Sequence, residues 1–115
     1  MQGLEISQYA GEGYKPMVRF ENWRVAFLRY ADRFDRANLH KLERHMQTDE
    51  VFVSLEGEAH LIIGEEMQEV SLEKNALYNV KKAVWHGIYV SKDAQVLIVE
   101  NADTGLDNTE YMDIR

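Results

Sequence analysis

The sequence predicts an all-β fold, either an antiparallel β-barrel or a two-sheet sandwich, in a single domain. Short runs rich in β-branched and aromatic residues recur along the chain, and turn residues separate them about every ten positions. No long segment shows a convincing helical pattern. At 115 residues the chain is long enough for one hydrophobic core and too short for two.

The amino-terminal part is predicted to form an arm followed by a hairpin. Residues 1–16 make up the arm, and the lone proline, Pro16, marks the point where it enters the first strand. Strands are expected over residues 17–20 and 23–30, with a short turn between them. Residues 32–38 are polar and are expected to form a loop.

The rest of the chain alternates between predicted strands and turns. The predicted strands span residues 39–45, 50–55, 59–63, 68–72, 76–80, 84–90 and 95–101. Glycine, asparagine and aspartate between these runs fit antiparallel connections. Residues 17–101 are therefore the predicted β-structure, and residues 102–115 are a carboxy-terminal tail. The tail is expected to begin as a loop, and its last residues either form a short edge strand or pack on a partner.

Composition excludes several classes of function. The sequence has no cysteine, which removes disulfides, thiolate zinc sites and cysteine nucleophiles. A formal net charge of -7 argues against binding to nucleic acid or anionic membranes, because both need clustered cations. No apolar run approaches the ~20 residues of a membrane span, and the first residues lack the order of a secretory signal. A cytoplasmic location is expected.

The stretch around His45 carries the best clue to function. His45 is followed five positions later by Glu50, and seven positions after that by Gly57. Polar residues between His45 and Glu50 indicate a turn, so these two side chains are expected at facing ends of two paired strands. Glu43 shares a strand face with His45, because side chains two apart point the same way. A second histidine, His86, begins a later apolar run. Two imidazoles and one or two carboxylates are therefore predicted to converge.

In these residues the sequence resembles the cupin superfamily, the small double-stranded β-helix barrels of the RmlC-like type. The first cupin motif is roughly G-x5-H-x-H-x(3,4)-E-x6-G, and the chain follows it from the second histidine onward as His45 and Glu50 with the closing glycine. Glu43 stands in place of the first histidine. The second motif, roughly G-x5-P-x-G-x2-H-x3-N, aligns with residues 75–90 and keeps only His86. The resemblance implies a single cupin jelly-roll domain over residues 1–115.

The resemblance also implies a metal site held by His45, Glu50 and His86, with Glu43 as a fourth ligand. Two imidazoles and one carboxylate on one side of a metal leave open positions for substrate or oxygen. An oxygen ligand in place of a nitrogen favours manganese, iron or zinc over copper. The alternative is that the ligand set has decayed, the histidines are satisfied by hydrogen bonds, and the cavity holds an organic ligand or nothing.

Strand parity predicts which residues line the cavity. Phe52 and Ser54 share parity with the predicted carboxylate ligand of their strand, and Ile88 shares parity with the second histidine. Trp85 is expected at the mouth of the pocket. His40 falls on the opposite face from the ligands and is expected at the surface. Such a pocket is small and largely apolar, with charge at one end.

Two functions remain open at this point. The first is a metal-dependent enzyme acting on a small polar metabolite. The second is a non-catalytic cupin module that binds a small molecule such as a sugar or a carboxylate, without metal. The fold cannot choose between them, because this barrel supports many unrelated chemistries. No residue is assigned a catalytic role from the sequence.

A homodimer is also predicted. The amino-terminal hairpin is rich in aromatic and apolar residues, among them Phe20 and Trp23, and a small barrel has little interior in which to bury them all. Apolar surface left uncovered in this way is commonly buried by a symmetric partner.

Overall fold

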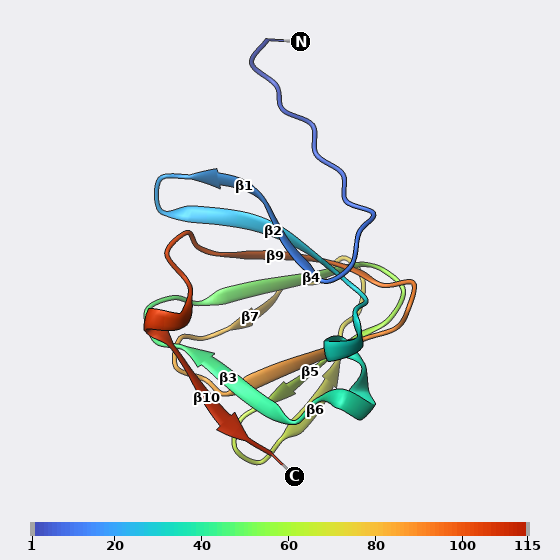
Figure 1. Ribbon diagram of the computed structural model, residues 1–115, viewed down its shortest axis with the longest axis vertical. Helices are drawn as coiled ribbons and strands as arrows, with labels where there is room; N and C mark the ends of the chain where they lie inside the picture. The colour runs from blue at the N-terminus through green and yellow to red at the C-terminus, as the bar shows by residue number, and fades with distance from the viewer. Residues whose placement is uncertain (1, 115) are drawn as a thin grey trace.

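A computed structural model describes residues 2–114 of the chain. Within this range, ten strands form two antiparallel five-stranded sheets that pack face to face (Figure 1). The strand order is β1-β2-β9-β4-β7 in the first sheet and β10-β3-β8-β5-β6 in the second. The chain is therefore a jelly-roll sandwich of two sheets, as the all-β prediction requires.

The first sheet contains the amino-terminal hairpin and the second contains the carboxy-terminal strand. The strands of the first sheet are β1 (Tyr14–Phe20), β2 (Trp23–Arg29), β9 (Gln95–Asn101), β4 (Glu50–Glu56) and β7 (Tyr78–Val80). Those of the second sheet are β10 (Thr109–Asp113), β3 (Lys41–His45), β8 (His86–Val90), β5 (Ala59–Ile63) and β6 (Gln68–Ser71). Three short 3-10 turns join them: η1 (Asp32–Phe34), η2 (Arg36–Asn38) and η3 (Leu106–Asn108).

The first strand begins earlier than the sequence predicts. β1 starts at Tyr14, and Pro16 lies inside it, where the pairing register with β2 shifts before Val18. Proline lacks a backbone N–H, so an edge strand at an irregular step is where a sheet tolerates it. The residues before β1 run away from the two sheets as an extended arm (Figure 1). Met1 and Arg115, the outer ends of the predicted arm and tail, lie outside the described residues.

Two other segments are more regular than predicted. The expected loop over residues 32–38 contains η1 and η2, and the side chain of Asp35 caps η2 by accepting a hydrogen bond from the Ala37 amide at 3.0 Å. The tail forms edge strand β10, which pairs with β3 from Thr109 opposite His45 to Asp113 opposite Lys41. Of the two alternatives for the tail, the structure shows the edge strand.

The core lies between the sheets and comes from the alternating buried residues of the facing strands. Phe52 and Ile98 are opposite each other on β4 and β9, and both are almost fully buried. The turn after β4 needs a glycine at position 57, because φ there is +64° and a Cβ would meet the Ala94 backbone at 2.7 Å. No helix in residues 2–114 is long and apolar enough to cross a membrane.

Candidate functional site

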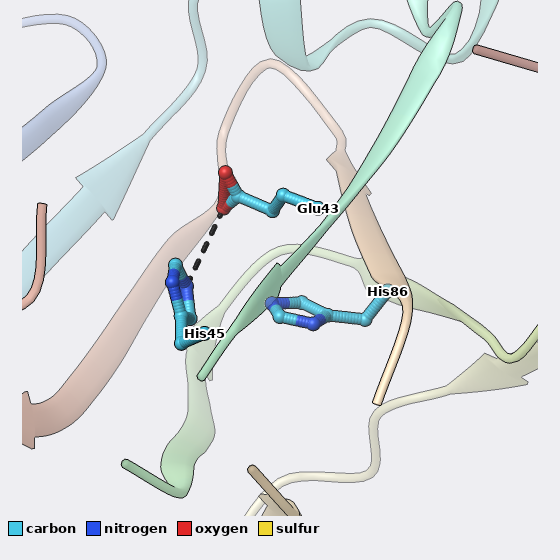
Figure 2. Close-up of side chains that lie close together, drawn as sticks. All are labelled: Glu43, His45 and His86. Atoms are coloured by element: carbon cyan, nitrogen blue, oxygen red, sulfur yellow. Dashed lines mark ion pairs between the residues drawn. The ribbon is translucent and has the colours of Figure 1, made fainter. Parts of the chain in front are cut away.

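The four predicted ligands come from both sheets and converge between them. Glu43 and His86 are register partners on β3 and β8, so their side chains leave the same face of the second sheet. His45 lies two residues further along β3 and points the same way. Figure 2 shows these three side chains together, with Glu43 Oε1 3.6 Å from His45 Nε2. Glu50 approaches from β4 of the first sheet.

Glu50 is the centre of the cluster. Its Oε1 lies 3.0 Å from Nε2 of His45 and 3.0 Å from Nε2 of His86. The side chains of these three residues are buried, whereas that of Glu43 is 40% exposed. The site therefore consists of three enclosed donor groups and one carboxylate at its rim.

The outer nitrogens of the two imidazoles are held by neighbouring groups. His86 Nδ1 lies 3.0 Å from the Val84 carbonyl oxygen, which can only accept, so this nitrogen carries a proton. His45 Nδ1 lies 2.9 Å from the hydroxyl of Thr109 on β10. Such outer contacts fix the orientation of metal-binding imidazoles and select their tautomer.

This donor set fits a divalent metal. With its proton on Nδ1, neutral His86 presents a lone pair on Nε2 to a carboxylate oxygen of Glu50 3.0 Å away. Two lone pairs at that distance require a positive charge between them, either a second proton on the ring or a cation bound by both groups. Imidazole nitrogens and a carboxylate oxygen are suitable ligands for manganese, iron or zinc.

The charges of the cluster depend on one another. Burial opposes the charged form of both imidazoles, but the hydrogen bond and negative charge of Glu50 outweigh it and raise the pKa of His45 and of His86. Burial alone would likewise raise the pKa of Glu50, yet the hydrogen bonds from the two histidines hold that pKa far below its ordinary value. In the metal-free protein the cluster is thus stabilised as an ion pair between Glu50 and protonated imidazole.

A second buried carboxylate, which the sequence reasoning missed, lies beside Glu50. Glu100 on β9 is opposite Arg24 on β2, and the register that pairs Val51 with Val99 sets Glu50 opposite Glu100. Arg24, Glu100 and Glu50 therefore form one row across three neighbouring strands. The available signal was that Glu100 continues the inward-facing positions of an otherwise apolar strand face.

Glu100 is held by an arginine and a tyrosine. Arg24 donates to Glu100 Oε2 through Nε at 3.0 Å and Nη2 at 2.7 Å, and the Tyr14 hydroxyl donates to the same oxygen. Arg24 also donates to the carbonyl oxygens of Ala102 at 3.2 Å and Thr104 at 3.0 Å. The guanidinium thus joins the buried carboxylate to the loop that follows β9.

Burial and the adjacent charge of Glu50 raise the pKa of Glu100 to about 7. Burial and the hydrogen bond to Glu100 raise the pKa of Tyr14 well above its ordinary value. The carboxyl group of Glu100 is therefore partly protonated near neutral pH when no cation is bound, and Tyr14 remains a hydrogen-bond donor.

A cavity of about 360 Å³ opens at this cluster, between the sheets. All four predicted ligands line it, together with Glu100, Arg24 and Tyr14. Its apolar lining includes Phe52 and Ile88, as parity predicts, and also Leu28 and Ile98. The exposed cations Arg33 and Lys41 also line the cavity. The pocket therefore combines an apolar wall with a charged cluster at one end.

Two of the predicted lining residues, Ser54 and Trp85, are not among those that line this cavity. Ser54 has the expected parity, but it lies further along β4, opposite Val96 in the closed part of the core. Trp85 precedes His86 and packs under the Arg44 guanidinium, 4.4 Å from the ring centroid. Parity predicts which face of a strand a side chain is on, but not whether that position along the strand borders the cavity.

His40, predicted at the surface, is exposed and also lines the cavity. His40 lies just before β3 begins at Lys41, so it is not part of the strand face that carries Glu43 and His45. It forms no part of the groups whose ligand atoms converge among residues 2–114.

Comparison with known proteins supports the fold and no closer relationship. No family model matches the sequence, and no curated protein matches it. A cupin-2 domain containing protein from Shewanella frigidimarina superposes with a TM-score of 0.58 and 19% identity, over 80% of this chain and 84% of its own. An RmlC-like cupin from Desulfovibrio desulfuricans superposes with a TM-score of 0.59 and 15% identity, over 88% and 96% of the two chains.

A third similar structure is the QdtA 3,4-ketoisomerase from Thermoanaerobacterium thermosaccharolyticum, solved in complex with TDP. It superposes with a TM-score of 0.62 and 14% identity, over 76% of this chain and 64% of its own. These likenesses, together with the two-sheet topology, define the class: the chain is an all-β jelly roll. Within that class it has the RmlC-like cupin fold.

Proposed function

We propose that the protein is a divalent-metal-dependent enzyme that acts on a small polar metabolite. The observation that carries this proposal is the convergence of two imidazole Nε2 atoms on one carboxylate oxygen, each at 3.0 Å, at the end of a cavity. His45, Glu50 and His86 would hold the ion, and Glu43 would be a fourth ligand. A divalent ion bound there would act as a Lewis acid on an oxygen atom of the substrate.

The lining of the cavity supports a substrate that carries a polar or anionic group. Arg33 lies with its guanidinium 4.4 Å from the Phe34 ring centroid, and the Lys41 ammonium lies 4.4 Å from that of Tyr111. Among the residues that the structure describes, neither cation forms an ion pair with a carboxylate, so both are available to a ligand. The QdtA complex with TDP shows that a protein with this fold accommodates a small molecule.

Glu43 has properties that suit a second role. It is the most exposed of the four carboxylate and imidazole groups in the cluster, at 40%. A carboxylate at the rim can accept a proton from a bound substrate, while the apolar residues behind it keep water out. Coordination and proton transfer are alternative uses of the same group.

The test is metal content and metal affinity. Protein purified without chelators should contain a divalent metal, and chelated protein should take up one equivalent of Mn²⁺, Fe²⁺ or Zn²⁺ in a calorimetric titration. His45→Ala or His86→Ala should abolish uptake, because each removes one of three or four ligands. His40→Ala is the matched control, since His40 lines the cavity without joining the cluster, and it should bind metal as the wild type does.

A second candidate is a metal-free module that binds a small molecule such as a sugar or a carboxylate. It is favoured by the two 3.0 Å contacts of Glu50, since protonated imidazoles alone can satisfy that carboxylate. Glu43→His, which restores the ligand set usual in cupins, separates the candidates. If wild type binds no metal and Glu43→His does, the metal-free module is correct and the enzyme proposal is wrong.

A further inference from the structure

The fold holds two buried carboxylates against each other. The antiparallel register of β4 and β9 pairs Val51 with Val99 and, continued by one residue, sets Glu50 opposite Glu100. Ligand atoms of His45, Glu50 and Glu100 all lie within 4.8 Å of one another, and the three residues are buried. Like charges directly opposite on neighbouring strands are destabilising, and burial strengthens their repulsion. Either a proton on Glu100 or a cation bound by both carboxylates relieves this repulsion.

The protein's own donors each contact one oxygen of the two carboxylates. Arg24 and Tyr14 both donate to Oε2 of Glu100. The two histidines both contact Oε1 of Glu50. Glu50 and Glu100 also interact directly, through their charges and a side-chain hydrogen bond, so the two carboxyl groups lie close enough to share a proton or to bind one cation.

We infer that Glu100 is a further ligand of the divalent metal, which the site then holds with two imidazoles and two carboxylates. The inference rests on the proposed function and places Glu100 of β9 in the fourth ligand position, in place of Glu43, beside His45, Glu50 and His86. A divalent cation next to Glu50 and Glu100 supplies charge opposite to both. Arg24 and Tyr14, bound to the other oxygen of Glu100, then orient this carboxylate as outer contacts orient metal ligands elsewhere.

The donor types bear on which metal the site prefers. Carboxylates suit Mn²⁺ and Mg²⁺, whereas imidazoles suit Zn²⁺, Cu²⁺, Ni²⁺ and Fe²⁺. Two carboxylates and two imidazoles, the same donor types as in the set with Glu43, therefore favour Mn²⁺ or Fe²⁺ over Cu²⁺. With Glu100 as the fourth ligand, Glu43 at the rim is free to act on the substrate as a base.

Affinity alone does not separate a ligand from a supporting residue, because loss of an outer contact also lowers metal affinity by roughly 10–100-fold. The discriminating measurement is the infrared difference spectrum of the chelated protein on addition of Mn²⁺, in the carboxylate-stretching region. The spectra and the resonances are recorded at about pH 8.5, above the raised pKa of Glu100, so that this carboxylate is ionised before the ion is added. Under that condition a carboxylate that coordinates the ion changes its stretching frequencies, whereas a supporting residue that keeps its hydrogen bonds does not. The variants are Glu100→Gln, which keeps the shape of the side chain, and Glu58→Gln, an exposed control.

We expect Mn²⁺ to shift the bands of two buried carboxylates in wild type and in Glu58→Gln, and one fewer in Glu100→Gln. If Glu100→Gln shows the same shifts as wild type, the inference is wrong and the proposed function stands. If wild type takes up no divalent metal, both fail. Should Glu100→Gln not fold, the carboxyl ¹³C resonance of Glu100, assigned in wild type, must move on addition of Zn²⁺, and an unmoved resonance overturns the inference.

Discussion

Glu100 provides a prediction about stability that needs no metal and no substrate. Burial and the charge of Glu50 raise the pKa of Glu100 from an ordinary 4.5 to about 7. A carboxyl group whose pKa is raised by folding contributes stability that is fully present below pH 4.5 and is lost as the pH rises through about 7. The metal-free protein should therefore become less stable from mildly acidic to neutral pH.

The size of the effect follows from the shift. Between the two pKa values the free energy of unfolding falls by about 1.4 kcal/mol per pH unit, so a change from about pH 5 to pH 6.5 should remove about 2 kcal/mol. For a domain of this length, that corresponds to a fall in Tm of roughly 8 °C.

This pH window separates Glu100 from the rest of the cluster. The pKa of His45 and of His86 is also raised, so their contribution is present below about pH 6.5 and lost above it. The pKa of Glu50 is lowered, so its contribution is present above about pH 4.5 and lost as the pH falls. Between these limits Glu100 is the member of the cluster that makes the free energy of unfolding depend on pH.

The assay is thermal unfolding followed by circular dichroism, in chelator, at several pH values between about 5 and 6.5. Glu100→Gln cannot titrate and should show a much flatter dependence of Tm on pH. Glu58→Gln, which removes an exposed carboxylate, should keep the slope of wild type. The same slope in wild type and Glu100→Gln would refute the reasoning.

Three further outcomes are expected. Replacing His86 by alanine should abolish Zn²⁺ binding in a calorimetric titration, and Glu43→Ala should weaken it less, because water can fill the vacated oxygen position; equal losses would contradict the ligand assignment. In urea titrations, Gly57→Ala should lower the free energy of unfolding by more than the ~1 kcal/mol that a left-handed backbone costs, because its Cβ would also meet the Ala94 backbone at 2.7 Å. Gly64→Ala, which has a similar backbone conformation and open space around it, should lower that free energy by the backbone cost alone. Light scattering at micromolar concentration should report a homodimer, and a monomeric wild type would count against this prediction. Trp23→Ser should shift the dimer toward monomer, because this apolar side chain is 43% exposed in the single chain.

The sequence was sufficient for the fold class and for the side chains that approach from β3 and β4, and the cupin resemblance added His86 on β8. Two-residue parity places Glu43 with His45 on one face, and the short polar turn before Glu50 brings that carboxylate back toward them. These relations are local, so spacing alone predicts them. The strand boundaries were less predictable at Pro16, where a bulge in an edge strand accepts a proline.

Relations between distant strands were not predictable in this way. Glu100 meets Glu50 because β9 pairs with β4, and Arg24 meets Glu100 because β2 lies on the other side of β9. No spacing motif records these pairings. Ser54 illustrates the same gap, because its parity was correct, but its place opposite Val96 in the closed core follows from the pairing of β4 with β9.

The division of the cluster between the two sheets has a mechanical consequence. His45 and His86 belong to the second sheet, and Glu50 and Glu100 belong to the first. An ion bound by all four would be a cross-link through the middle of the sandwich, in a protein that has no cysteine to form a disulfide. Chelation would then leave the cavity end of the two sheets joined by packing and by the contacts of Glu50 with the two imidazoles, and amide exchange in β3 and β8 would report that end opening first.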